Sequence, residues 1–152
     1  MSRESRLTAG VLLVLLPAVV YGGTSILSLL IGDPTYAQNG LRQDLWRAGH
    51  AHAGVLLVLS LVTLRYVDEA NLPGWLAGFA RHSIPAAAVL LPAAFFLSVL
   101  SPEATEPNAM IYLAFVGALL LASGVFVLGV GLIRKPMNRQ VGRGEARKPY
   151  VS

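Results

Sequence analysis

Two histidines that lie close together, His50 and His52, are the residues of this chain best suited to chemistry. They come just before an apolar run that extends from Ala53 to Leu64. At about 1.5 Å per helical residue, that run is too short to cross roughly 30 Å of hydrocarbon. A helix that spans a membrane here must therefore carry both histidines into it. An ionisable side chain at that depth marks a candidate functional site.

The spacing of the two histidines separates them on a helix. His50 and His52 are two residues apart, which places their rings about 200° apart around the helix axis. A helix that binds one metal ion with two histidines usually spaces them by three or four residues. We therefore expect each ring to need its own partner from a second helix, a second protomer or a ring-shaped cofactor. Asp44, Arg47, His50 and Gly54 recur at steps of three and four and form one stripe.

Four kinds of chemistry are open to these histidines. Neutral imidazole is a common axial ligand of haem, and small neighbours such as Gly54 would let a flat ring approach the backbone. Copper or zinc would accept imidazoles from two protomers, or His50 and His52 together with Asp44 or an outer-loop carboxylate. An imidazole with an ordinary pKa near 6.5 can also load and release protons beside Asp44 and Arg47. Finally, both rings can simply form hydrogen bonds between helices.

The pattern Arg47-x-x-His50-x-His52-x-Gly54 continues into an aliphatic run that ends at Arg65-Tyr66. It resembles the second helix of subunit I in haem-copper oxidases and nitric oxide reductases, whose histidine is an axial haem ligand. The resemblance covers about 20 residues and implies one axial ligand, at His50 or else at His52. That family uses further histidines on later helices, and this chain has none in the outer halves of its later spans. The resemblance therefore leaves three alternatives: a five-coordinate haem, a haem shared by a dimer, or no haem. The chain also resembles small four-span bacterial membrane proteins.

The composition predicts an integral membrane protein, because 55% of the residues are hydrophobic and only 13% are charged. Apolar stretches predict spans at about 7–31, 48–65, 83–101 and 109–133. The expected fold is an all-α, four-helix membrane bundle of one domain, residues 1–133. Residues 134–152 form a basic tail that we expect to be disordered and attracted to anionic lipid. The absence of cysteine excludes thiolate metal sites and covalently attached c-type haem.

The positions of the basic residues predict the orientation. Of the twelve Lys and Arg residues, only Arg42 and Arg47 fall outside if both termini are cytoplasmic. The acidic residues Glu103 and Glu106 share that outer side. The first apolar run is longer than the core of a secretory signal, so we expect it to remain as a span. These features predict a multi-pass protein of the inner, plasma membrane.

Several function classes are disfavoured. The sequence has no phosphate-binding loop, no nucleophile elbow and no paired intramembrane carboxylates, so a conventional enzyme is not expected. The leading hypothesis is a small haem- or metal-binding membrane protein, an accessory of a respiratory or redox system. The alternatives are a structural or assembly subunit without a cofactor, and a channel or carrier for a small solute. The expected partners are lipid and a homo-oligomer or larger membrane complex, and nucleic acid is not expected.

Overall fold

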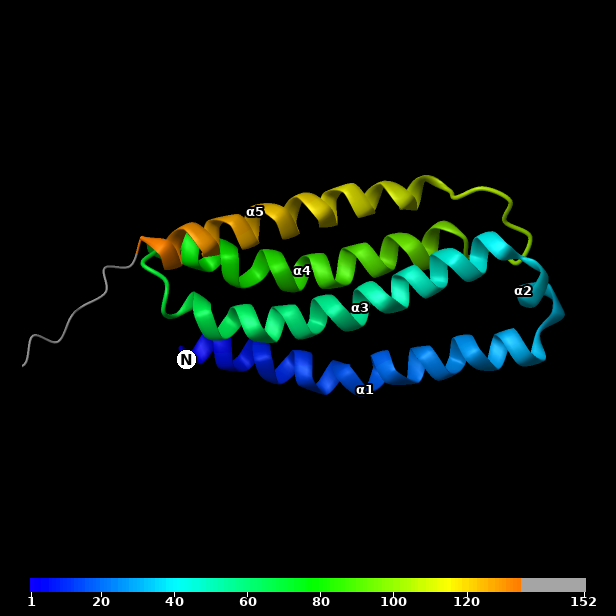
Figure 1. The fold of residues 1–152 in the computed structure, drawn as a ribbon, viewed down its shortest axis with the longest axis horizontal. Coiled ribbons are helices and arrows are strands. Elements are labelled where there is room, and N and C mark those ends of the chain that lie inside the picture. Colours follow the sequence, from blue (N-terminus) through cyan, green and yellow to red (C-terminus); the bar gives the residue numbers. More distant parts are fainter. Residues whose placement is uncertain (135–152) are drawn as a thin grey trace, which may run out of the picture.

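The computed structural model describes residues 1–134, and within them the chain is almost entirely helical (Figure 1). Four long helical segments form the body of the molecule: α1 (Arg3–Gly32), α3 (Gly40–Val67), α4 (Gly74–Ser98) and α5 (Leu113–Ile133), the last preceded by the 3-10 turn η1 (Ala109–Tyr112). The short helix α2 (Pro34–Gln38) joins α1 to α3. Each of the four long segments is apolar and long enough to cross a membrane. The all-α class and the four apolar segments are therefore confirmed, whereas the predicted tail beyond Arg134 lies outside the described residues.

The long helices lie side by side in the order α1, α3, α4 and α5 (Figure 1). α3 packs between α1 and α4, and α4 packs between α3 and α5. α1 is the least covered of them: only 6% of its most apolar segment is buried, against 44% in α4. The bundle is thus an open row, and α1 forms one edge of it.

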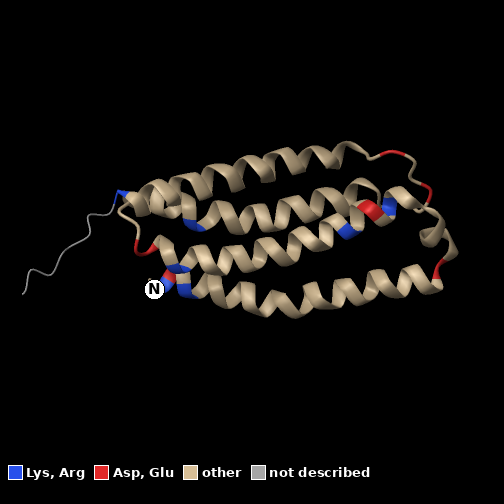
Figure 2. Cartoon of the chain, in the orientation of Figure 1, with Lys and Arg blue, Asp and Glu red and all other residues tan. Residues whose placement is uncertain are grey.

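Charged side chains gather at the two ends of this row, and the middle of every long helix is free of them (Figure 2). We call the end that holds α2 the α2 end and the opposite one the N-terminal end. The α2 end carries Arg42 and Arg47 together with acidic loop residues. The N-terminal end carries Arg65, Arg81 and the first turn of α1. This distribution is typical of helices whose central parts face hydrocarbon.

Glycines hold α5 close to α4. Gly117, Gly124 and Gly131 are spaced by seven residues and are all buried. A Cβ atom on Gly117 would lie 2.9 Å from Cγ of Leu91, and one on Gly131 would lie 2.6 Å from Leu72. Small residues permit such close approach between helices in lipid. The glycine-rich side of α5 is therefore a packing surface.

A network of hydrogen bonds fixes α1 at the N-terminal end. The side chain of Arg81, on α4, is only 11% exposed and lies 3.1 Å from Oδ1 of Asp68, just after α3. Its Nε donates to Oγ of Ser5, a fully buried residue of α1, and that hydroxyl donates to Asp68. The backbone N–H of Ser2 also donates to Asp68, at 2.6 Å. One carboxylate and one guanidinium therefore join three helices.

The protonation of Asp68 reflects these contacts. Burial by itself would raise the pKa of this carboxyl, but hydrogen bonds from Ser2, Arg81 and Ser5 outweigh that effect and lower the pKa below its ordinary value of 3.8. Glu4 also pairs with Arg81, although its side chain is 71% exposed. An exposed pair contributes little to stability. Asp68 is therefore the main partner of Arg81.

Candidate functional site

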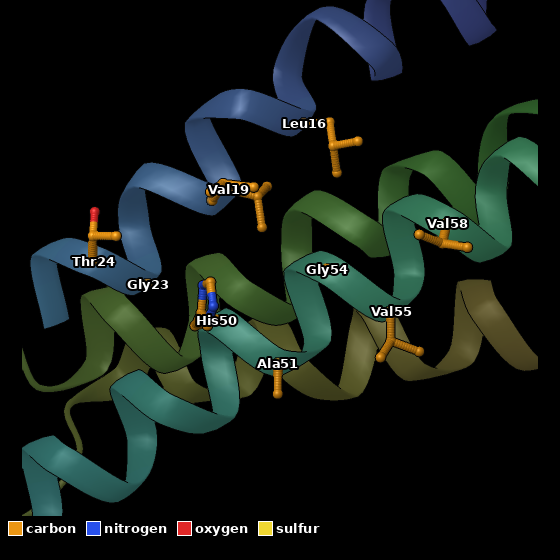
Figure 3. A pocket seen from close by; sticks show the side chains of 10 residues that line it. Leu16, Val19, Gly23, Thr24, His50, Ala51, Gly54, Val55 and Val58 are labelled. Carbon is orange, nitrogen blue, oxygen red and sulfur yellow. The ribbon is translucent and has the colours of Figure 1, made fainter. Parts of the chain in front are cut away.

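His50 lies in the first half of α3, and its ring faces α1 (Figure 3). A Cβ atom on Gly23 would lie only 2.7 Å from Nε2 of His50, and one on Gly22 would lie 3.9 Å from Nδ1. The imidazole thus occupies space that two glycines leave free. The pair Gly22-Gly23 is what lets a histidine fit between these two helices.

Apolar recesses flank the histidine on both sides of the contact between α1 and α3. The larger, of about 740 Å³, is lined by Val19, Gly23, Thr24, His50 and Gly54, together with aliphatic neighbours (Figure 3). The smaller recess, of about 290 Å³, includes His50 and Phe96. The larger volume lies within the range of pockets that hold small ligands. His50 is the only titratable group in either lining.

Few polar atoms compete for a ligand in these recesses. The hydroxyl of Thr24 already donates to the carbonyl of Tyr21 at 2.8 Å. His50 has no hydrogen-bond partner among residues 1–134, in contrast to His52. The nitrogens of His50 are consequently the free polar groups of the site.

The two histidines contact different helices, which confirms the prediction from their spacing. The ring of His52 packs 5.2 Å from that of Phe95 on α4, and its Nδ1 lies 2.7 Å from the carbonyl oxygen of Ala48. Arg47 interacts within its own helix, with Gln43 at 2.6 Å and Asp44 at 3.9 Å. Of the predicted cofactor-binding residues, therefore, only His50 and Gly54 share a recess.

The residues predicted as metal ligands do not come together. Within residues 1–134, no three histidine or carboxylate side chains are close enough to hold one metal ion, so the set of His50, His52 and Asp44 is not assembled. The cause is the helix itself, which turns His52 toward α4 and His50 toward α1. The carboxylate of Asp44 is 81% exposed beside Arg47. The structure lends no support to a copper or zinc site at these three residues.

Axial ligation of haem by His50 stays a prediction, and the contact with α1 restricts one of the two ring nitrogens. A Cβ atom on Gly23 would lie only 2.7 Å from Nε2, so a haem iron bound to that nitrogen would require α1 to move away from α3. The Cβ atom of a residue at Gly22 would lie 3.9 Å from Nδ1, so this nitrogen is approached less closely.

A second cluster, at the α2 end, was not predicted from the sequence. Arg42 is only 6% exposed, and its guanidinium carbon lies 4.6 Å from the ring centre of Trp46 and 5.7 Å from that of Tyr36. The sequence interpretation placed Arg42 only on the outer side. The four-residue spacing of Arg42 and Trp46 on one helix was the available signal.

No protein-family model, no curated protein and no solved structure matches the chain.

Proposed function

We propose that this protein binds a lipid-soluble ligand with a hydrogen-bonding head group, of the quinone type, in the larger recess between α1 and α3. The observation that carries the proposal is the position of His50, whose unpaired ring nitrogens border an otherwise apolar recess of about 740 Å³. The recess opens between exposed aliphatic residues such as Val20 and Val55, the surface that lipid would cover. A carbonyl head group would accept a hydrogen bond from the imidazole, and its hydrocarbon tail would follow the aliphatic lining.

This proposal keeps the predicted redox role and changes the ligand. A hydrogen bond to a quinone carbonyl uses the same in-plane direction of a ring nitrogen as a metal bond does, but a carbonyl oxygen is far smaller than a haem. A Cβ atom on Gly23 would lie 2.7 Å from Nε2, whereas one on Gly22 would lie 3.9 Å from Nδ1. We therefore assign the hydrogen bond to Nδ1, the nitrogen that the glycines of α1 approach less closely.

Replacing His50 with alanine is expected to weaken the binding of decylubiquinone by about tenfold or less. This factor corresponds to the net free energy of one hydrogen bond. Trp46 serves as the reporter, because it lies one helical turn before His50 on α3, and His50 lines the larger recess. In a Trp75→Phe background Trp46 is the only tryptophan, and quenching of its fluorescence follows the titration in detergent.

The matched control is His52→Ala, which removes the same side chain from the side of α3 that faces α4. It should leave the affinity unchanged. Equal losses of affinity in His50→Ala and His52→Ala would refute the proposed site. So would the absence of saturable quenching in the parent protein. A Soret absorption band that disappears in His50→Ala would instead establish haem as the ligand.

We further propose that the four long helices span the inner, plasma membrane with the N-terminal end cytoplasmic. The support is the charge distribution: Arg3, Arg6, Arg65 and Arg81 lie at that end, whereas Arg42 and Arg47 share the α2 end with four acidic residues.

Single cysteines test this orientation, since the natural chain has none. Thr105→Cys, in the exposed loop at the α2 end, should react with a membrane-impermeant maleimide in intact cells. Asn71→Cys, at the other end, should react only after the cells are permeabilised. The reverse pattern would invert the proposed topology.

A further inference from the structure

Arg42, Tyr36 and Trp46 form a compact cluster at the α2 end, and none of them lines the proposed ligand recess. The ring centres of Tyr36 and Trp46 are 5.5 Å apart, and the guanidinium carbon of Arg42 lies within 6 Å of both, at 5.7 and 4.6 Å. Asn39, the N-cap of α3, ties this region to the loop before α5 through two hydrogen bonds to the carbonyls of Pro102 and Ala104. The cluster is therefore held in place from three segments of the chain.

The charge of Arg42 lacks a partner of opposite sign. Its Nε donates to the carbonyl of Val99 at 3.2 Å, and among residues 1–134 no carboxylate forms an ion pair with it. The closest candidate in sequence, Asp44, pairs with Arg47 and is 81% exposed. A buried cation normally requires an anion, because aromatic faces and one carbonyl compensate only part of its desolvation.

The two aromatic residues add further unused donors. The hydroxyl of Tyr36 and Nε1 of Trp46 are both buried and have no hydrogen-bond partner in the part of the chain that the structure describes. Tyr36 as a whole is fully buried. Burial raises the pKa of this phenol, against the opposing effect of Arg47 and Arg42, so the hydroxyl keeps its proton at neutral pH. Arg and Trp side chains can only donate, so the cluster contains an excess of donors and one positive charge.

We propose that this cluster is a binding site for a small anion, held by the guanidinium of Arg42 with the hydroxyl of Tyr36 and the indole N–H of Trp46 as additional donors. An anion accepts hydrogen bonds from all three and neutralises the guanidinium, which a neutral water molecule cannot do. Chloride, inorganic phosphate and the phosphate of a lipid headgroup share the required chemistry.

The site is tested with Trp46 as the only tryptophan, in the Trp75→Phe background. In detergent, sodium chloride and sodium phosphate are titrated against sodium gluconate at constant ionic strength. In a second arm, the protein is placed in nanodiscs of phosphatidylglycerol or of phosphatidylcholine, with gluconate as the only other anion. A saturable change in Trp46 emission in detergent identifies a free anion. A change seen only with phosphatidylglycerol identifies a lipid headgroup.

Three variants test whether the response comes from the cluster. Arg42→Gln should abolish it, whereas Arg47→Gln, which alters an exposed arginine one turn away, should preserve it. Tyr36→Phe removes a single oxygen and leaves the ring packing intact, so it keeps the test valid if Arg42→Gln does not fold. We expect Tyr36→Phe to weaken the affinity about tenfold or less, as for one hydrogen bond. No response in either arm, or a response unchanged by both Arg42→Gln and Tyr36→Phe, would overturn the anion site.

Discussion

Replacing Arg81 with methionine should lower the free energy of unfolding by about 3 kcal/mol, the lower part of the range for a broken buried ion pair. Methionine keeps much of the volume but leaves Asp68 without a cation and removes the donor to Ser5. The loss is large because the side chains of Arg81 and Asp68 are only 11% and 14% exposed. Unfolding in detergent with increasing mole fractions of dodecyl sulfate, followed by circular dichroism, gives the measurement.

A matched control is Arg65→Met, which breaks the pair between Arg65 and Glu69 in which both side chains are 40% exposed or more. We expect a loss of about 0.5 kcal/mol or less there, as for other exposed helix pairs. The double variant Arg81→Met with Asp68→Leu should be more stable than Arg81→Met alone, since no unpaired charge remains. Similar losses for Arg81→Met and Arg65→Met would show that the network does not stabilise α1.

The same network gives the protein a defined response to acid. The pKa of Asp68 is lower in the folded protein than its ordinary value of 3.8, so the ionised form is favoured by folding. Its contribution to stability is fully present above that ordinary pKa and is lost as the pH falls through the lower, folded value. In Arg81→Met the pKa of Asp68 is lowered less, and the acid-dependent part of the stability should shrink accordingly.

Replacing Gly23 with valine should reduce quinone binding by more than tenfold, a larger effect than removing the ring of His50. The first carbon of the new side chain would lie 2.7 Å from Nε2 and 2.9 Å from Cε1 of His50, so the imidazole must turn away. The remaining methyl groups would also fill part of the larger recess, which Gly23 lines. The variant therefore loses the hydrogen bond and the space for the ligand together. Quenching of Trp46 fluorescence by decylubiquinone measures the effect.

Gly10 offers a control on the same helix, because nothing lies within 4 Å of a Cβ atom placed there. Gly10→Val should leave both binding and stability close to those of the parent protein. Comparable losses of affinity in Gly10→Val and Gly23→Val would mean that valine acts through α1 in general and that the recess beside His50 is not the binding site.

Local patterns predicted much of this structure. The apolar stretches located the four helices, and the spacing of His50 and His52 placed their rings on different sides of α3. Each of these properties is set by residues near one another in the chain. The glycines opposite His50 could not be assigned to it from the sequence, because which helix faces which depends on the assembled fold.

The two charged clusters were missed for the same physical reason. Arg42 was placed only on the outer side, and it is buried because Tyr36, Trp46 and the segment at Val99 surround it. Arg81 was counted only among the cytoplasmic basic residues, and its partners lie 13 residues away at Asp68 and 76 residues away at Ser5. No local periodicity encodes contacts over such separations.

The network around Arg81 also relates the first helix to the last of its partners to be synthesised. α1 is translated first, and Ser2 and Ser5 at its N-terminal end form hydrogen bonds to Asp68, which follows α3. The cation that pairs with this carboxylate, Arg81, lies in α4 and is translated later still. The ion pair at this end of α1 is therefore complete only when the beginning of α4 has been made.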